Sequence, residues 1–434
     1  MKLLLRKCIS PKGEIKMGGD KSITHRGLII GAIAQGKTVV HGYSRCADCM
    51  ATLEIFKQLG ISIKESGATI SIEGKGLDGF VEPDDVLDCK NSGTTMRLLA
   101  GVLSGQNFFS VLTGDSSLRQ RPMNRIIKPL NQMGAEIHSR CGGFAPLGIK
   151  GCKLKSINYK LPVASAQVKS AILLAGLYAD EETIVEEPKL TRDHTERMFN
   201  LFGAKVEKED KKIILKEKNK LNAQELIIPG DISSAAYFIA LACLASDSEL
   251  YLKDIGVNPT RTGILDVLKM MGADISVVNT RTVSNEPIAG LMIKYSKLKT
   301  REISGQLIPR LIDEMPILAV AATQAQGITV VKDAAELRVK ETDRIRAIVA
   351  GLKNMGAKIE EKKDGFIVEG PTRLYGAQCS SFGDHRIAMA LTIAGFIADG
   401  QTIIDGAECI SISFPEFITL TKTVCGEANV TIQD

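Results

Sequence analysis

The sequence lacks the features that mark several special classes of protein. No apolar run among its 434 residues reaches the roughly 18 residues that a membrane-spanning helix needs. The opening MKLLLRKC has too few consecutive apolar residues for a signal peptide. The formal net charge is only +5, which does not favour a nucleic-acid-binding protein. We therefore expect a cytoplasmic protein that binds neither nucleic acid nor membrane, long enough for two or more domains.

Paired cysteines are also scarce. The ten cysteines are scattered along the chain, which does not indicate a disulfide framework. One pair, Cys46-Ala47-Asp48-Cys49, has the spacing of metal ligands or of a redox pair, and His41 lies just upstream. A structural zinc site needs four ligands, and the sequence has no second pair of this kind. We therefore expect no metal site here, and interpret the pair as two thiols at the start of a helix.

What the sequence does contain is a repeated segment. The stretches FKQLGISI, LNQMGAEI, FNLFGAKV, LKMMGADI and LKNMGAKI each close a helical pattern with a glycine and then begin a short alternating strand. A polar, small-residue opening begins each unit, and six such openings occur: GDKSITHR, NSGTTMR, SAQVKS, GDISSAAY, IDEMPILA and GDHRIAMA. The sixth unit lacks the Met-Gly-type ending, so we expect it to be the most divergent repeat.

The repeats predict an α/β protein of two domains. Their spacing of roughly 65 to 80 residues is longer than the unit of common solenoids. Six units divide more naturally into two sets of three, with breakpoints at Gly18-Gly19 and Pro229-Gly230, where glycine and proline interrupt regular structure. We expect one domain over residues 19–228, a second over 1–18 and 229–434, and a cleft between them.

The segment GAIAQGKT, residues 31–38, fits the P-loop pattern for nucleotide phosphates. A P-loop needs a strand before its glycines and a helix after its lysine, so that the helix N-terminus faces the phosphate. Here SITHRGLIIGAIA predicts a helix that ends at Gly36, and TVVHGY predicts a strand behind it. Because the order is reversed, we interpret the match as coincidental and Lys37 as a solvent-facing residue.

The unit openings carry most of the candidate chemistry. The stretch NSGTT places hydroxyls, backbone N–H groups and a glycine at a helix start, an arrangement that favours an anion. Arginines supply planar forks for phosphate or carboxylate. A single arginine is most often a solvated surface charge, but basic residues recur at the openings of both expected domains. We therefore expect two anionic ligands, or one large one.

Two carboxylates stand among these cations. Asp313 could accept a proton from a substrate hydroxyl, or it could cap the apolar helix that follows it. Glu341 could act as an acid or base, or it could form a plain intrahelical ion pair with Arg344. For His25 and His385 we favour structural hydrogen bonding.

The sequence resembles the enolpyruvyl transferases of the EPSP synthase type through motifs that occur in the same order, namely GDKSITHR, NSGTTMRLLAG, GDSSLRQRPM, LPVASAQVKSA, TRDHTERM, PGDISSAAYF, LRVKETDRI and GDHRIAM. The resemblance implies two domains, each of three βαβαββ-type units, that close over the site. It implies transfer of the enolpyruvyl group of phosphoenolpyruvate to the 5-hydroxyl of shikimate 3-phosphate, by addition and elimination through a tetrahedral intermediate, in aromatic amino-acid biosynthesis. It also implies a monomer that uses no metal or cofactor.

Carried over motif by motif, the resemblance implies site residues. Contacts to shikimate 3-phosphate are expected from Lys21, Ser22, Arg26, Ser165, Ala166, Gln167, Arg192, Asp313 and Lys340. Contacts to phosphoenolpyruvate are expected from Lys21, Gly93, Arg121, Gln167, Arg344 and Arg386. Asp313 would take the proton of the 5-hydroxyl, and Glu341 with Lys21 would handle the proton at the methylene carbon.

The chain departs from the family pattern at three positions, of which one bears on the site. Gly19 stands where a proline is frequent and Thr24 where serine is commoner, whereas Ile412 stands where some members carry a lysine near the phosphate. The nearest alternative is the sister enzyme that acts on UDP-N-acetylglucosamine. It typically has Lys-Asn in place of Lys21-Ser22 and a cysteine in the loop before Arg-Pro. A nucleotide-dependent phosphotransferase is a weaker alternative, because it rests on the GAIAQGKT match that we interpret as coincidental. A noncatalytic repeat scaffold is also weaker, because a scaffold needs none of Lys21, Arg121, Asp313, Lys340, Arg344 and Arg386.

Overall fold

The computed structural model describes residues 1–217 and 219–433, and these form two compact units. The first unit comprises Met1–Gly18, Pro229–Thr282 and Pro287–Asp434, and the second comprises Gly19–Ile228 and Val283–Glu286. This division differs from the expected one in assigning Val283–Glu286, the tip of a hairpin, to the second unit. Each unit has a hydrophobic core of its own.

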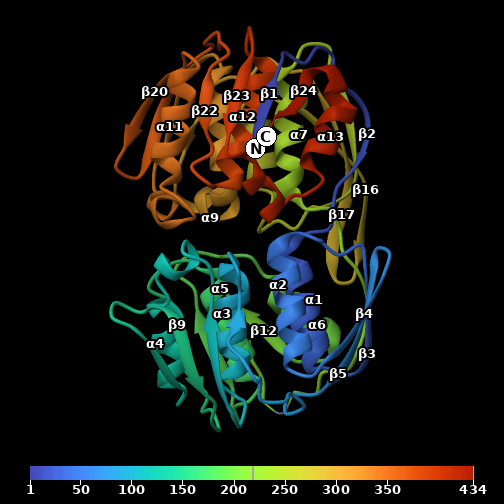
Figure 1. The fold of residues 1–434 in the computed structure, drawn as a ribbon, viewed down its shortest axis with the longest axis vertical. Helices are drawn as coiled ribbons and strands as arrows, with labels where there is room; N and C mark the ends of the chain where they lie inside the picture. The colour runs from blue at the N-terminus through green and yellow to red at the C-terminus, as the bar shows by residue number, and fades with distance from the viewer. Residues whose placement is uncertain (218, 434) are drawn as a thin grey trace. The chain divides into compact units, whose positions relative to one another are not determined.

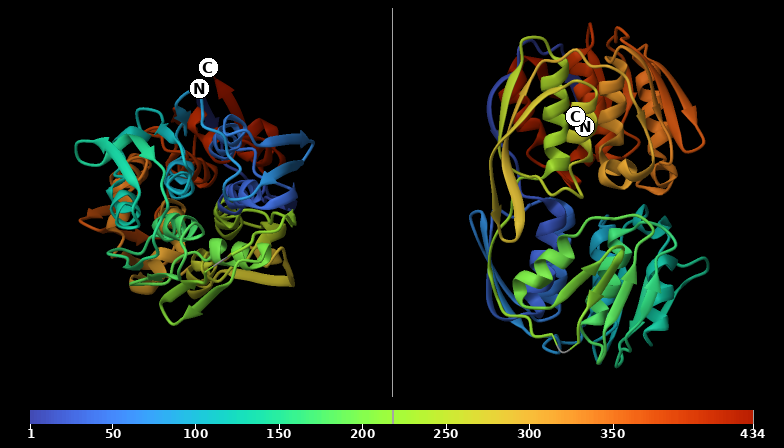
Figure 2. Two further views of the ribbon diagram at one scale, coloured as in Figure 1. Left: turned by 90° about the horizontal axis from the view of Figure 1, so that it is seen from below. Right: turned by 180° about the vertical axis from the view of Figure 1, so that it is seen from behind.

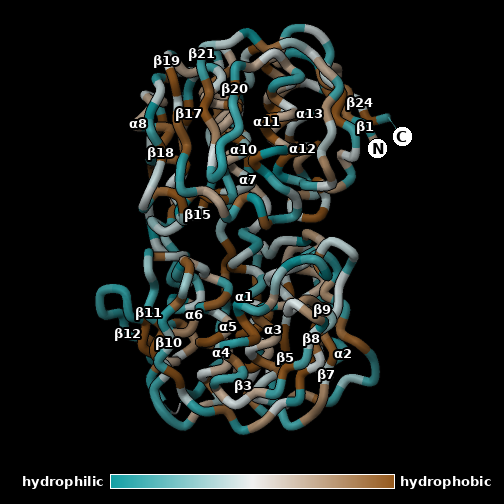
Figure 3. The backbone as a smooth tube through the Cα atoms, turned by 90° about the vertical axis from the view of Figure 1, so that its left-hand side faces the viewer, coloured by the Kyte–Doolittle hydropathy of each residue, from teal (hydrophilic) through white to brown (hydrophobic). Residues whose placement is uncertain are grey.

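Three helices run through the inside of each unit. Their side chains are buried on almost every face, because the sequence is apolar or small all round rather than on one stripe. Figure 3 shows these helices as largely hydrophobic tube, while the loop beside β12 is hydrophilic. The inner helices are α1 (Lys21–Ile33), α3 (Gly93–Leu103) and α5 (Ala166–Gly176) in the second unit, and α7 (Ile232–Leu244), α10 (Met315–Thr323) and α12 (His385–Ile397) in the first.

Six four-stranded sheets cover these helices, three in each unit (Figures 1 and 2). In every sheet one pair of neighbouring strands is parallel. In four of the sheets an inner helix lies between the two strands of this pair in the chain, as a parallel connection requires. The sheets of the second unit run β14 (Glu225–Ile227), β3 (Gln35–His41), β5 (Thr69–Lys75), β4 (Ser62–Ser66); β6 (Leu87–Asp88), β7 (Phe109–Thr113), β9 (Phe144–Lys150), β8 (Glu136–Arg140); and β10 (Asn158–Lys160), β11 (Thr183–Glu186), β13 (Lys212–Leu215), β12 (Val206–Glu209).

The sheets of the first unit follow the same plan. They run β16 (Asp274–Val283), β17 (Glu286–Lys294), β15 (Glu249–Gly256), β2 (Lys12–Lys16); β18 (Glu302–Ile303), β19 (Gly327–Val331), β21 (Gly365–Gly370), β20 (Lys358–Lys362); and β22 (Gln378–Ser380), β23 (Thr402–Asp405), β1 (Lys2–Leu5), β24 (Val430–Gln433). The N-terminal segment supplies β1 and β2 to two of these sheets, which explains why it belongs to the first unit. The predicted α/β fold of repeated βαβαββ-type units is confirmed.

In five of the repeats a second helix ends just before a glycine, as the sequence pattern predicts. Gly60, Gly134, Gly203, Gly272 and Gly356 all have positive φ, the conformation that ends a helix most easily at glycine. The helices outside the inner set are α2 (Ala47–Gln58), α4 (Asn124–Gln132), α6 (His194–Phe202), α8 (Gly263–Met270), α9 (Ile308–Leu311), α11 (Arg344–Asn354) and α13 (Phe417–Cys425). In five of the repeats, a strand begins within a few residues after this glycine.

The prediction that the first helix ends at Gly36 is wrong. Helix α1 ends at Ile33, and its C-cap residue Ala34 is already extended. Gly36 lies inside β3 with a φ of +100°, and the Gln35 amide donates to the Leu221 carbonyl at 2.9 Å. The helix therefore stops where the backbone takes a hydrogen-bond partner almost two hundred residues away in the sequence. The order of helix before strand remains, so GAIAQGKT does not have the architecture of a P-loop.

Candidate active site

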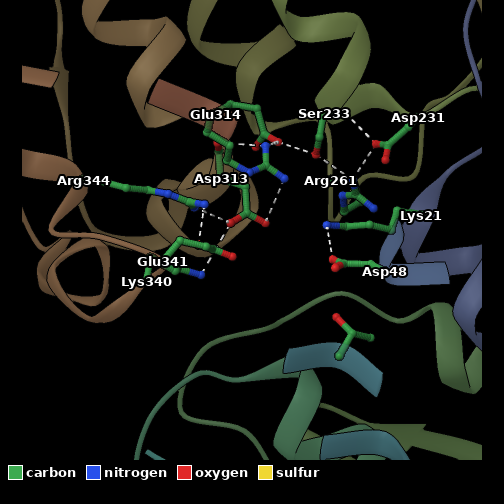
Figure 4. A network of polar contacts seen from close by, with 12 residues as sticks. Lys21, Asp48, Asp231, Ser233, Arg261, Asp313, Glu314, Lys340, Glu341 and Arg344 are labelled. Atoms are coloured by element: carbon green, nitrogen blue, oxygen red, sulfur yellow. Dashed lines mark hydrogen bonds and ion pairs between the residues drawn. The ribbon is translucent and has the colours of Figure 1, made fainter. Parts of the chain in front are cut away.

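In the first unit, the candidate site gathers at the starts of inner helices. The short 3₁₀ turn Ile312–Glu314 precedes α10 and presents Asp313 to three cations (Figure 4). Asp313 Oδ1 lies 3.4 Å from both Lys340 Nζ and Arg344 Nη1, and Oδ2 lies 3.8 Å from Arg386 Nη2. Helix α10 begins at Met315 with Glu314 as its N-cap residue, so the alternative that Asp313 caps this helix is wrong.

Arg344 is the most deeply buried cation of this cluster. Its side chain is 2% exposed, and its Nε lies 2.8 Å from Asp384 Oδ2 while Nη2 lies 2.6 Å from Glu341 Oε2. Burial alone would lower the pKa of the Arg344 guanidinium, but the charges of Asp384 and Glu341 outweigh it and raise the pKa. Because α11 begins at Arg344, Glu341 precedes the helix, and its ion pair with Arg344 is not the plain intrahelical pair considered as an alternative.

Arg386 stands at the second position of α12. Its backbone N–H donates to the N-cap Asp384 at 2.8 Å, and its Nη1 donates to the Asp313 carbonyl at 3.0 Å. Burial would lower the pKa of Arg386, but Asp313 and neighbouring anions raise it above the ordinary value. Arg344 and Arg386 thus remain charged, and each is held in place by carboxylates.

A further network lies behind Asp313 at the start of α7. The N-cap Asp231 accepts from the Ser233 amide at 2.8 Å and from Arg261 Nη2 at 3.1 Å. Arg261 Nη2 also donates to Ser233 Oγ at 2.8 Å, and that hydroxyl donates to Glu314 Oε1 (Figure 4). All four side chains are nearly buried, so this network fixes the turn on which Asp313 stands.

In the second unit, Lys21 begins α1. The N-cap Asp20 accepts from the Ile23 amide at 2.9 Å, which fixes the first turn of the helix. Lys21 Nζ lies 2.9 Å from Asp48 Oδ2, at the start of α2 (Figure 4). Ser22 lies beside Lys21 and is partly exposed.

The starts of α3 and α5 meet through side chains. Arg97 Nη1 donates to Gln167 Oε1 at 2.7 Å, and Gln167 Nε2 donates to Thr94 Oγ1 at 3.0 Å. A Cβ on Gly93 would lie 2.7 Å from Arg97 Nη1, so glycine at this position leaves room for that guanidinium. Arg121 is 8% exposed, and its Nη2 donates to Asn91 Oδ1 at 2.7 Å beside the same helix start.

Arg26 is buried in the second unit, where its guanidinium binds other residues of the protein. It is 4% exposed. Its Nε donates to Thr195 Oγ1 at 2.7 Å, Nη2 donates to Ser170 Oγ at 2.8 Å and Nη1 donates to the Ser22 carbonyl at 2.8 Å. Arg26 therefore ties α1 to α5 and α6.

A second buried cation supports the same region. Lys169 is 1% exposed, and its Nζ lies 3.1 Å from Glu187 Oε1 and 2.5 Å from Glu196 Oε1. Burial would lower the pKa of Lys169, but Glu196 and Glu187 raise it. This cluster joins α5, which follows the N-cap Ser165, to the segment before α6 that carries Arg192.

The structure groups the sequence-predicted residues within each unit as follows. Asp313, Lys340, Glu341, Arg344 and Arg386 form one cluster in the first unit. In the second unit, Lys21 and Ser22 begin α1, Gly93 begins α3, Ser165, Ala166 and Gln167 begin α5, and Arg121 and Arg192 lie in loops. Sequence reasoning assigned no role to Asp48, Asp231, Arg261, Glu314 or Asp384. Asp231 and Asp384 could have been found from the sequence, because each belongs to the Gly-Asp pair that opens a repeat.

The described residues contain neither a metal-binding cluster nor a membrane-spanning helix. Over residues 1–217 and 219–433, no group of three or more His, Cys, Asp and Glu side chains could hold a metal ion. Within the same residues, no helix combines the length and apolar character that a membrane crossing requires.

The fold is that of an enolpyruvyl transferase. An enolpyruvyl transferase from Streptomyces tendae, NikO, has the same fold with a TM-score of 0.79 at 15% identity, over 98% of this chain and 97% of that one. A solved EPSP synthase from Acinetobacter baumannii is closer, with a TM-score of 0.90 and 44% identity over 100% of both chains.

The sequence comparisons define the family more narrowly. Residues 7–420 match the family described as EPSP synthase (3-phosphoshikimate 1-carboxyvinyltransferase). A relative from Citrifermentans bemidjiense named 3-phosphoshikimate 1-carboxyvinyltransferase is 53% identical over 97% of this chain and 98% of its own. A relative of the same name from Petrotoga mobilis is also 53% identical, over 95% of this chain and 96% of its own. The chain belongs to the EPSP synthase family, and the alternative sister enzyme is not favoured.

Proposed function

We propose that Asp313, Glu341 and Lys21 carry the proton transfers of the reaction that this chain catalyses. The chain transfers the enolpyruvyl group of phosphoenolpyruvate to the 5-hydroxyl of shikimate 3-phosphate, giving 5-enolpyruvylshikimate 3-phosphate and phosphate. In the addition, the 5-hydroxyl oxygen bonds to C2 of phosphoenolpyruvate, the hydroxyl loses its proton, and the methylene carbon gains one. In the elimination, the new methyl group loses a proton and the bond from C2 to the phosphate oxygen breaks.

Asp313 is the proposed base for the 5-hydroxyl, and its surroundings are the observation that carries the proposal. Its carboxylate lies within 3.4 Å of two cations, which stabilise its charge in a site that is only 14% exposed. A partly buried carboxylate on a helix-start turn, held in place by cations from another segment, can receive a hydroxyl proton without moving.

Glu341 and Lys21 are the proposed groups for the proton at the methylene carbon. Glu341 is partly buried, with 21% of its side chain exposed, and its ion pair with Arg344 fixes its orientation. Lys21 is oriented by Asp48 in the second unit. A lysine and a glutamate can together supply the proton in the addition and remove it in the elimination.

The remaining residues are proposed as binding groups. Ser22, Ser165, Ala166, Gln167, Arg192 and Lys340 hold shikimate 3-phosphate, and Gly93, Arg121, Gln167, Arg344 and Arg386 hold phosphoenolpyruvate. Helix starts supply backbone N–H groups for both anions. Because three N–H groups of Arg26 already serve Ser22, Ser170 and Thr195, we propose that Arg26 supports shikimate 3-phosphate chiefly through these partners.

We propose that the two compact units are the two domains of the protein, with boundaries at 18/19 and 228/229. A monomeric state stays a prediction from the family resemblance, and a cytoplasmic location stays a prediction from the sequence. Gel filtration with light scattering tests the first, and fractionation of the source cells tests the second.

The decisive experiment measures phosphate release from phosphoenolpyruvate without added metal. Release is expected only when shikimate 3-phosphate is also present. Asp313→Asn keeps the size of the side chain but removes its basicity, and we expect kcat to fall by about 10²- to 10⁴-fold. Asp247→Asn makes the same change in an exposed turn of the same unit and is the control. Release with UDP-N-acetylglucosamine in place of shikimate 3-phosphate, or full activity of Asp313→Asn, contradicts the proposal.

A further inference from the structure

A chain of hydrogen bonds lies beneath the helix starts of the second unit. Helices α1, α2 and α3 pack against one another there (Figure 1). His25 follows Lys21 by one turn of α1, and Thr52 follows Asp48 by one turn of α2. Residues four positions apart share a helix face, so the chain runs one turn below the ion pair of Lys21 and Asp48. The reaction steps proposed above use neither His25 nor Thr52.

Each link of this chain is short and buried. His25 Nδ1 lies 2.8 Å from Thr52 Oγ1, and Thr52 Oγ1 lies 2.7 Å from Thr95 Oγ1. The Thr95 hydroxyl in turn donates to Ser92 Oγ at 2.6 Å. All four residues are 0% exposed. Bulk water therefore does not compete for these groups, and each hydrogen bond is stronger than the same contact in water.

The protons of the chain can be arranged in one direction only. A hydroxyl has one proton to donate. Thr95 donates its proton to Ser92 Oγ, since the Asp48 carbonyl is farther away at 3.4 Å. Thr95 must therefore accept the proton of Thr52. Thr52 must then accept from His25, which places a proton on Nδ1 of that ring.

The state of the His25 ring agrees with this direction. Burial, followed by the charges of Lys21 and Arg26, lowers the pKa of His25 well below its usual value. The ring is therefore neutral and carries one proton. Because the chain needs that proton at Nδ1, Nε2 carries none.

The other end of the chain lies at the start of α3. Ser92 is the N-cap residue of this helix and accepts from the Thr95 amide at 3.1 Å. Gly93, a proposed contact of phosphoenolpyruvate, is the next residue. Thr94 follows and accepts from Gln167 Nε2 at 3.0 Å. The chain therefore holds the turn that presents α3 to the proposed ligand.

We propose that Thr52 is a positioning residue that holds the start of α3 for phosphoenolpyruvate through Thr95, and that the Nδ1–H tautomer of His25 fixes Thr52. The inference rests on the proposed function, because that function makes Gly93 a contact of phosphoenolpyruvate. Without the Thr52 hydroxyl, the His25 N–H and the Thr95 oxygen lose their shared partner. The cap of α3 then loses the support of α1 and α2, and the turn at Gly93 shifts.

The test measures phosphate release by Thr52→Val, which keeps the size and branching of the side chain but removes its hydroxyl. We expect the KM for phosphoenolpyruvate to rise about tenfold, which corresponds to about 1.4 kcal/mol, the scale of one hydrogen bond. The KM for shikimate 3-phosphate should rise less than about twofold, because most of its proposed contacts lie outside this turn. Thr52→Ser keeps the hydroxyl and should behave as the unchanged protein does.

Two further variants control for the loss of a buried hydroxyl. Thr183 is also fully buried in the second unit, and its hydroxyl has no hydrogen-bond partner among the described residues, so Thr183→Val should leave both KM values unchanged. Thr95→Val breaks the next link and should raise the KM for phosphoenolpyruvate by a similar factor. If Thr52 and Thr95 act along one chain, the double variant raises this KM little more than either single change does, whereas independent effects multiply.

The tautomer of His25 can be measured on the unchanged protein. Nuclear magnetic resonance of protein with isotope-labelled histidine distinguishes a protonated ring nitrogen from a bare one. We expect a proton on Nδ1 and none on Nε2 at neutral pH, in the signals that are missing from His25→Gln. This measurement and Thr95→Val decide the question if Thr52→Val does not fold.

The inference is overturned if Thr52→Val leaves the KM for phosphoenolpyruvate unchanged while Gly93→Ala raises it. It is also overturned if the two valine substitutions multiply in the double variant, or if His25 carries its proton on Nε2. If Gly93→Ala has no effect either, the proposed contact at the start of α3 is wrong, and that result counts against the proposed function as well.

Discussion

Asp384 binds the guanidinium of Arg344 and the backbone N–H of Arg386, and removing its charge is the sharpest test of these two proposed phosphoenolpyruvate contacts. The side chain is fully buried, lies 2.8 Å from Arg344 Nε, and accepts from the Arg386 amide at 2.8 Å as the cap of α12. The substitution Asp384→Asn keeps the size of the side chain and an oxygen that can cap the helix. It therefore isolates the charge that faces Arg344.

The expected magnitude follows from these contacts. A hydrogen bond to a charged group contributes about 1.5–3 kcal/mol, and breaking a buried ion pair outright costs about 3–5 kcal/mol. Asparagine still accepts one hydrogen bond and Glu341 still pairs with Arg344, so we expect the free energy of unfolding to fall by about 2–3 kcal/mol. If about half of this loss reflects misorientation of Arg344, the KM for phosphoenolpyruvate rises about tenfold.

The assay measures phosphate release as a function of phosphoenolpyruvate at saturating shikimate 3-phosphate, and then the reverse. Urea unfolding followed by circular dichroism measures stability, because the chain has no tryptophan to report on it. Asp399→Asn is the control, since Asp399 also has two cationic partners, Lys7 and Arg373, but its side chain is 31% exposed. We expect that control to change stability by less than about 1 kcal/mol.

One result would refute this reasoning. If Asp384→Asn lowers the stability as expected while both KM values and kcat are unchanged, Arg344 does not contact phosphoenolpyruvate. A rise in KM confined to shikimate 3-phosphate would also contradict the assignment.

Three more predictions concern the second unit. Gly93→Ala should raise the KM for phosphoenolpyruvate and weaken glyphosate binding, because its methyl group displaces Arg97 from Gln167; unchanged affinities for both ligands would contradict this. Lys169→Met leaves two buried glutamates without their cation, and should lower the free energy of unfolding by about 3–5 kcal/mol and raise the KM for shikimate 3-phosphate more than that for phosphoenolpyruvate. Burial, followed by Lys21 and Arg26, lowers the pKa of His25 well below its usual value. Because only the unfolded chain then binds this proton, stability should fall as the pH drops below about 6.5, by up to about 1.4 kcal/mol per pH unit, and less in His25→Gln by urea unfolding at each pH.

The fold was largely predictable because its signals are local. A glycine with positive φ at the end of a helix, such as Gly134 or Gly356, follows directly from the sequence pattern. Repetition of that pattern then reveals the repeats. The wrong prediction at Gly36 has the opposite cause. Residues 35 and 36 belong to β3 because they pair with Leu221 and with β5, which are distant in the sequence. No local pattern indicates such partners.

The candidate site was predictable only in part, for a related reason. Motifs mark the residues that present unusual chemistry at a helix start, such as Lys21, Arg344 and Arg386. They do not mark the partners that hold those residues. Glu314 follows Asp313 directly and reads as one more charge in the sequence, yet it is 1% exposed and accepts a hydrogen bond from Ser233.

The Gly-Asp pairs that open three of the repeats show why such partners are hidden. Asp20, Asp231 and Asp384 each cap an inner helix by accepting a backbone N–H, and this structural role suffices to explain an aspartate at that position. Two of them nevertheless also pair with buried arginines, Asp231 with Arg261 and Asp384 with Arg344. A buried guanidinium needs a carboxylate partner, because an unpaired buried charge is strongly unfavourable. An aspartate that already caps a helix can serve as this partner. The same side chain therefore fixes the helix and orients the cation. In the sequence such an aspartate is fully explained as a helix cap. Its ion pair with an arginine becomes evident only in the structure, where the two residues lie close together.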